Sequence, residues 1–178
     1  MKPILNAFLK TIVFIFFTGV SMAQESIKTD NLYIELKTDV QTLVEPLFNI
    51  IIKIVMKQGQ FLPVGAILNN EKKVEMVAAT DSSWEKRKVS ATEVLPLLHE
   101  VLKKSIESGN GIATGVAEDV TISPEGQGPS KAIKLLFEHK RGLTIAVYLP
   151  YQRSLFGKFK TGEMIIQSAK PEVCAWKN

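Results

Sequence analysis

Two carboxylates and one histidine are the residues of this chain whose types and spacing best fit acid–base chemistry. Glu118 and Asp119 are neighbours in the stretch GIATGVAEDVTI, and His139 ends the stretch AIKLLFEH. If residues 112–122 form a strand, alternation places Glu118 on the same face as Val116, which is otherwise apolar. A carboxylate in such surroundings has a perturbed pKa and can act as a general acid or base. The sequence therefore offers Glu118 and His139 as candidate catalytic residues.

A solvated position for Glu118 is the competing interpretation. A bulge at Glu118–Asp119, or a strand that extends beyond the core, would leave both carboxylates in water. His139 can approach Glu118 only if their two strands pair. The chain contains no Gly-x-Ser-x-Gly elbow, and two histidines with one cysteine give no zinc-ligand spacing. We therefore expect no metal and no cofactor, and an enzyme is the second choice among functions.

A basic and aromatic stretch, YQRSLFGKFK, is the better candidate for a binding surface. It places Tyr151, Arg153, Lys158 and Lys160 close together in the chain. Such stretches can hold anionic glycans, lipids or nucleic-acid strands, and binding residues commonly lie on loops held by a rigid sheet. The alternative is a connector whose aromatic rings pack on the core while its lysines stay in water.

The glycines of SGNGIATG do not predict a phosphate loop. A phosphate loop runs from a strand through glycines into the N-terminus of a helix, where free N–H groups face the anion. Here Gly109 follows an apolar helical pattern and precedes a strand pattern. It is therefore predicted to end a helix.

The first 23 residues predict a secretory signal peptide. Lys2 and Lys10 accompany an apolar run too short to span a bilayer, and Ser21-Met22-Ala23 provides a cleavage site after Ala23. We expect an exported, periplasmic or extracellular protein with one domain over residues 24–178 and no membrane span after processing. The leader holds two lysines and no acid, so its loss lowers the net charge from +4 to +2. So small a charge argues against nucleic acid as a partner.

One cysteine, Cys174, is present, so no internal disulfide can form. No local pattern links it to a histidine. We interpret Cys174 as a half-buried apolar residue near the chain end.

The first element of the domain is predicted to be a strongly apolar helix. Apolar residues recur every three or four positions from Leu32 to Leu47, although residues 31–37 also alternate as a short strand would. Thr42-x-x-Glu45 followed by Pro46 predicts either a helix start at Thr42 or a kink there. Because LFNIIIKIVM is apolar nearly all round, this helix is either covered on several sides or docks a partner, including a second copy in a homodimer.

The rest of the chain alternates between strand and helix signals. A second helix is predicted from about Ser90 to Ile106. We expect Phe61–Leu68, apolar on both faces, to lie inside the sheet beside Leu143–Tyr151. The predicted strands are Phe61–Leu68, Lys73–Ala79, Ile112–Ile122, Ala132–His139, Leu143–Tyr151 and Glu163–Ser168.

These elements predict an α+β fold, with an antiparallel sheet of five to six strands packed by two main helices in the order α-β-β-α-β-β-β(-β). This order resembles profilin-like and roadblock-like layouts, and it also allows the cone of a cystatin-like or nuclear-transport-factor-like sheet. Element order does not transmit function. The function expected from the sequence is a non-enzymatic binding or protein-interaction module, with an unidentified ligand or protein partner. A small hydrolase or isomerase, or a homodimeric structural protein, is the alternative.

Overall fold

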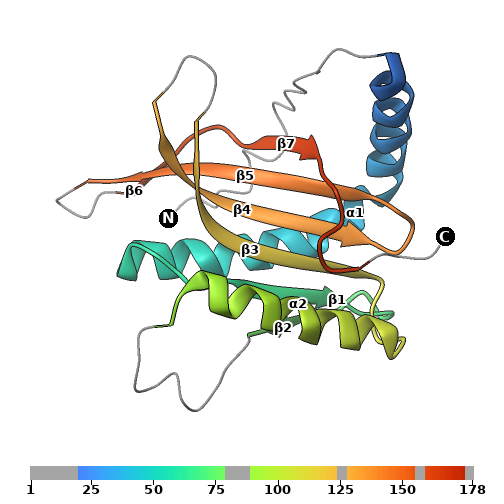
Figure 1. The fold of residues 1–178 in the computed structure, drawn as a ribbon, viewed down its shortest axis with the longest axis horizontal. Coiled ribbons are helices and arrows are strands. Elements are labelled where there is room, and N and C mark those ends of the chain that lie inside the picture. Colours follow the sequence, from blue (N-terminus) through green and yellow to red (C-terminus); the bar gives the residue numbers. More distant parts are fainter. Residues whose placement is uncertain (1–19, 79–88, 124–127, 155–158, 175–178) are drawn as a thin grey trace.

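The computed structural model describes residues 20–78, 89–123, 128–154 and 159–174. Within them the chain forms two helices and a single sheet of seven strands (Figure 1). In chain order the elements are α1 (Val20–Gln58), β1 (Val64–Leu68), β2 (Val74–Val77), α2 (Ala91–Glu107), β3 (Ala113–Ile122), β4 (Ser130–His139), β5 (Thr144–Arg153), β6 (Phe159–Thr161) and β7 (Ile165–Ser168).

The sheet is antiparallel throughout. Its strands lie in the order β2-β1-β3-β4-β5-β6, and β7 also pairs with β5. The predicted α+β class with two helices and an antiparallel sheet is confirmed. The predicted count of five to six strands is too low, because Phe159–Thr161 adds a short strand where the sequence indicated a loop.

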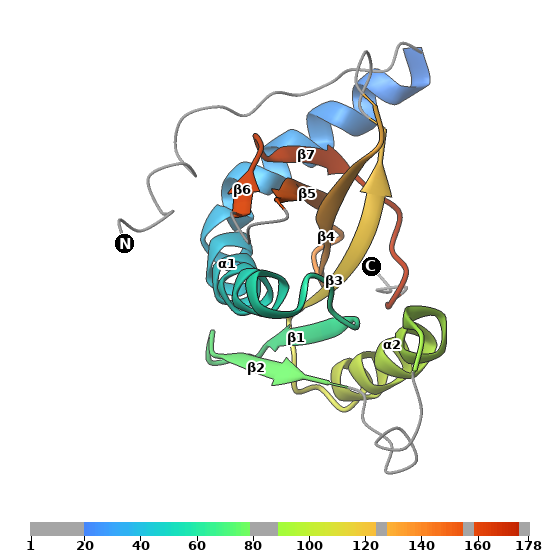
Figure 2. The same cartoon turned by 90° about the vertical axis from the view of Figure 1, so that its left-hand side faces the viewer.

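The sheet curves around α1 (Figure 2). α1 lies on the concave face, and α2 and the chain's C-terminal segment lie on the opposite face. Two apolar clusters correspond to these faces. The larger joins α1 to the sheet, and the smaller joins Ile67 and Val116 of the sheet to Leu98 and Leu102 of α2 and to Val173.

α1 is buried along one stripe because its apolar residues recur at helical spacing. Leu43 and Leu47 are fully buried in the larger cluster. A Cβ added to Gly115 on β3 would lie 2.3 Å from Leu43 Cδ2, so glycine is what lets helix and sheet approach here. This close contact fixes the position of α1 across the centre of the sheet.

The sequence left two alternatives open at the start of the first helix, and the structure decides between them. Residues 31–37 are helical rather than a strand, and the helix runs through Thr42, whose hydroxyl donates to the Thr38 carbonyl instead of capping a new helix. Pro46 lies inside α1, and the axis of the helix changes direction along its length in Figure 1. A proline removes one backbone hydrogen bond and bends a helix, which agrees with the alternative of a kink.

The predicted neighbour of the first strand, Leu143–Tyr151, was wrong. β1 lies inside the sheet as expected, but it pairs with β2 and β3 rather than with Leu143–Tyr151. Ile67 consequently faces α2, whereas Ile145 and Val147 face α1. Apolar residues on both faces indicate that a strand is interior, but they do not select which strand lies beside it.

The second helix and its ends follow the prediction. Ser90 precedes α2, and the Glu93 carboxylate accepts a hydrogen bond from the Ser90 backbone N–H at 2.9 Å. Gly109 follows the helix with φ of 82°, the left-handed conformation that glycine adopts without strain. The glycine stretch is therefore a helix end, as its order in the chain indicated.

The predicted leader, residues 1–23, lies almost wholly outside the described residues, and the predicted cleavage site falls in the first turns of α1. Within the described parts of the chain, neither helix is long and apolar enough to cross a membrane.

Candidate functional site

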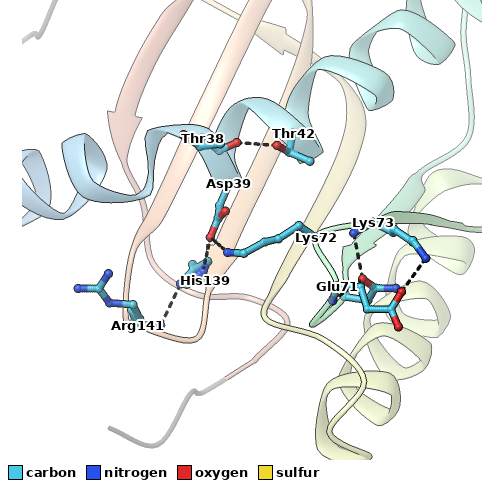
Figure 3. A network of polar contacts seen from close by, with 9 residues as sticks. Thr38, Asp39, Thr42, Glu71, Lys72, Lys73, His139 and Arg141 are labelled. Carbon is cyan, nitrogen blue, oxygen red and sulfur yellow. Dashed lines mark hydrogen bonds and ion pairs between the residues drawn. The ribbon is translucent and has the colours of Figure 1, made fainter.

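A polar cluster joins α1 to two turns of the sheet (Figure 3). At its centre, Asp39 of α1 lies 2.5 Å from Lys72 Nζ in the β1–β2 turn and 3.3 Å from His139 Nε2 at the end of β4. Arg141, in the β4–β5 turn, pairs with Glu35 one helical turn before Asp39. Asp39 and His139 are buried, whereas the Arg141–Glu35 pair is exposed. The cluster therefore links three segments that are distant in sequence.

Both ring nitrogens of His139 face protein groups. Nδ1 accepts a hydrogen bond from the Arg141 backbone N–H at 3.1 Å, so in the neutral ring the proton lies on Nε2. Nε2 faces the Asp39 carboxylate but makes no hydrogen bond of good geometry. Burial lowers the pKa of His139, Asp39 opposes this shift, and Lys72 and Lys140 add to it. A ring held in this way has no nitrogen directed at solvent for proton transfer to a substrate.

The structure does not bring Glu118 and His139 together. Their strands do pair, as the catalytic hypothesis required, but Ala113 lies opposite His139 while Glu118 lies opposite Lys134. Ala113 and His139 face α1. Glu118 is five positions along β3 from Ala113, and an odd number of positions places it on the other face.

Glu118 instead takes part in a small charged group on the α2 side of the sheet. Its carboxylate lies 2.9 Å from Lys134 Nζ, which is also 3.1 Å from Glu172 near the C-terminus. Burial alone would lower the pKa of Lys134, but the hydrogen bonds and charges of Glu118 and Glu172 outweigh burial and raise it. Lys134 therefore stays charged and bridges two carboxylates.

The most deeply buried carboxylate, Glu138, was not singled out from the sequence. It has no exposed surface, and its two oxygens accept hydrogen bonds from the backbone N–H groups of Glu172, Val173 and Cys174 at 2.6, 2.8 and 2.9 Å. One side chain thus holds the C-terminal segment against the sheet. The sequence signal was an acid directly after the apolar run Leu135–Phe137, because an acid buried in such surroundings needs internal hydrogen-bond partners.

Cys174 belongs to the same C-terminal segment and packs in the smaller apolar cluster. Burial, with smaller effects from the Glu138 and Glu107 charges, raises the pKa of its thiol to about 11. It is therefore protonated at neutral pH and packs as an apolar residue, as the sequence indicated.

Tyr151, predicted to bind a ligand, is buried. Its hydroxyl donates to Asp119 at 3.0 Å and its ring stacks on Phe159, with centroids 5.5 Å apart. Burial, together with the hydrogen bond to Asp119, raises the pKa of Tyr151 well above its usual value. Asp119 also lies 3.5 Å from Lys131 Nζ. These contacts support the interpretation of this stretch as a connector pinned by its aromatic rings.

The basic residues of the same stretch are divided between the two faces of the sheet. Arg153 is exposed on the face that carries Tyr151, and a Cβ added to Gly59 would lie 2.6 Å from its Nη1, so the guanidinium lies at the C-terminal end of α1. Lys160 pairs in register with Gln152 and lies on the opposite face. Lys158 lies outside the described residues.

Arg153 therefore adjoins a surface that sequence reasoning did not single out. We call it the basic strip: Ile50, Lys53, Met56 and Lys57 on α1, with Arg153 at its end. Helical spacing places its four α1 residues on one side of the helix, and all four are exposed. Ile50 and Met56 are 37% and 47% exposed, which is high for large apolar side chains.

The α1 part of the basic strip has no acidic residue near it in the chain. No Asp or Glu occurs between Glu45 and Glu71 in the chain. Within the described residues, no ion pair joins Lys53, Lys57 or Arg153 to a carboxylate. Lys57 lies in the last turn of α1, where the helix dipole favours a cation, but the dipole explains neither Lys53 nor the exposed Ile50 and Met56.

Comparison with known proteins identifies no relative: no family model, no curated protein and no solved structure matches the chain. Within the described parts of the chain, no group of three or more His, Cys, Asp or Glu side chains is placed to hold a metal ion.

Proposed function

We propose that this protein is an exported, non-enzymatic interaction module whose contact surface is the basic strip. The observation that supports this proposal is a contrast between the buried acids of the protein and the exposed cations of the strip. Buried or half-buried acids such as Asp39, Glu118 and Glu138 have internal partners, whereas the cations of the strip have none among the described residues. Unpaired charge beside exposed apolar side chains is a surface that a partner can complement.

The catalytic alternative has less support. A general acid or base must reach the substrate, and Glu118 and His139 lie on opposite faces of the sheet with their polar atoms engaged by Lys134, Asp39 and the Arg141 backbone. Their positions fit the stabilisation of contacts between elements.

Photo-crosslinking in cells that export the protein tests the proposed surface. A photoreactive residue is placed at Met56 in the strip and, as a matched control, at Leu97 on α2, which is 44% exposed. We expect a discrete adduct, protein or lipid, from Met56 and none of comparable yield from Leu97. Equal yields at both positions, or no adduct at either, would contradict the proposal.

The same experiment separates the proposal from the homodimer alternative. Much of the apolar surface of α1 is already buried in the larger cluster, including Leu47 and Ile51. A homodimer through the first helix would therefore use the apolar residues that α1 leaves exposed, which are Ile50 and Met56 in the strip and Ile34 nearer the start of the helix. An adduct at Met56 with twice the mass of the chain would favour a homodimer over a different partner.

A further inference from the structure

We infer that the partner of the basic strip is an anionic lipid bilayer, to which the protein binds at the surface without crossing it. This inference rests on the proposed function, because it names the occupant of the same surface. It starts from two properties of the strip together, its three cations without an ion-pair partner among the described residues and the exposed Ile50 and Met56 beside its lysines.

The order of residues along the strip fits a bilayer interface. Ile50 and Met56 can enter the boundary between headgroups and acyl chains, while Lys53 and Lys57 extend their charged ends to the phosphates. Arg153 adds a third cation at the end of the helix, and a guanidinium binds phosphate oxygens in a bidentate way. Leu62, 42% exposed and five residues beyond Lys57, adds apolar surface to the same end of the molecule.

The shape of the surface favours a bilayer over an acidic peptide. The strip is the outward side of a helix whose other side is packed on the sheet, so it is convex. A peptide bound by a helix or sheet usually occupies a groove or adds a strand to an edge. A convex row of cations and apolar residues can meet a planar surface without a groove.

The expected strength of binding is modest. Each Lys or Arg close to an anionic membrane contributes roughly a fivefold factor in partitioning, and this attraction decays over about 10 Å at 0.1 M salt. The three cations therefore contribute roughly a hundredfold. Binding should be strong at low salt and should increase with the fraction of anionic lipid. At physiological salt the attraction between charges is weaker, so binding should depend more on the apolar contacts.

Vesicle co-sedimentation tests the inference. The protein is purified from the exported fraction, as the cell processes it, and mixed with vesicles of phosphatidylcholine alone or containing phosphatidylglycerol. We expect binding only to the anionic vesicles, reduced as salt rises. Lys53→Glu with Lys57→Glu should weaken binding by about 25-fold or more, because two attractive charges are lost and two repulsive ones appear.

A matched charge reversal provides the control. Lys37 and Lys170 are exposed and lie outside the strip, so Lys37→Glu with Lys170→Glu changes the net charge equally. This control should bind within about threefold of the unaltered protein, because both changes are remote from the strip. Lys37 precedes Lys53 by about 24 Å of helical rise along α1, and Lys170 follows Ala169, which bonds Thr144 at the end of β5 opposite Arg153. Met56→Ser should reduce binding at physiological salt more than at low salt.

Three results would overturn the inference: equal binding to neutral and anionic vesicles, binding that salt does not change, or equal losses in the two reversals. The salt dependence is measured on the unaltered chain, so it tests the inference even if a variant fails to fold. Failure of the inference is distinguishable from failure of the proposed function. A discrete protein adduct at Met56 without vesicle binding would leave the interaction surface in place and replace the bilayer by a protein.

Discussion

Around Asp39, charged residues of α1 face oppositely charged residues of other elements, whereas the last two turns of the same helix present lysines to solvent. Asp39 contacts Lys72 of the β1–β2 turn and His139 at the end of β4. Lys53 and Lys57, farther along the helix, have no such partner among the described residues. Removing Asp39 breaks charge-assisted contacts in a buried position, whereas removing one of these surface lysines breaks no such contact. The first region should therefore govern stability and the second should govern binding.

The largest effect on stability should come from Glu138, which represents the internally paired class on the other side of the sheet. Glu138→Ala leaves three backbone N–H groups without their acceptors, so we expect a loss of about 3 kcal/mol or more in the free energy of unfolding, measured in urea. Glu138→Gln should cost less, because its remaining oxygen can still accept two of these bonds. If the free energy of unfolding of Glu138→Ala lay within about 1 kcal/mol of that of the original protein, the internal hydrogen bonds of Glu138 would not stabilise the fold as proposed.

A smaller loss is expected from Asp39, and the exposed pair beside it provides the control. Asp39→Asn removes the charge that accepts the Lys72 hydrogen bond and faces His139, and we expect a loss of about 2 kcal/mol, the usual contribution of a hydrogen bond to a charged group. Glu35→Gln breaks an ion pair whose two side chains are more than half exposed, which should cost about 0.5 kcal/mol or less. Urea unfolding of both variants tests the difference, and equal losses would show that burial does not separate the two pairs.

The stability of the protein should also depend on pH through His139 of the same cluster, with a smaller effect than that of Asp39→Asn. The folded pKa of His139 lies below its unfolded value near 6.5, so below that pH the unfolded chain takes up a proton that the folded chain resists. The contribution of His139 is therefore complete above about pH 6.5 and is lost as the pH falls through the folded pKa. Thermal unfolding across this range should show a decline in melting temperature that flattens in His139→Asn. An unchanged decline in that variant would assign the effect to other groups.

The smallest effect on stability is expected in the basic strip. Lys53→Glu should change the free energy of unfolding by no more than about 0.5 kcal/mol, as surface substitutions usually do. Lys57 lies in the last turn of α1, so Lys57→Glu should cost slightly more, about 0.5–1 kcal/mol, through the helix dipole. Urea unfolding of each single variant tests this order. A loss of more than about 2 kcal/mol at Lys53 would move the strip into the structural class and remove the basis for a contact surface.

The sequence by itself determined the kind and approximate place of most elements. The spacing of Leu36, Val40, Leu43 and Leu47 gave a buried helical face, and Gly109 gave the end of the second helix. These signals are local, because helical periodicity and glycine at positive φ depend on residues only a few positions apart. The sequence also predicted a packed rather than reactive Cys174, since no local partner accompanies it.

Tertiary structure alone decided which residues meet. Local alternation could place Glu118 and His139 on strands, but the faces they share depend on register, and a shift of one residue reverses a face. The order of strands likewise depends on contacts between distant segments: β1 lies beside β3 rather than β5, and Ile67 and Val116 of these two strands share a cluster with α2. Glu138 acquired its three N–H partners from residues 34 to 36 positions later in the chain. The approach of Arg153 to the end of α1 joins segments nearly 100 residues apart, beyond the range of any periodic pattern.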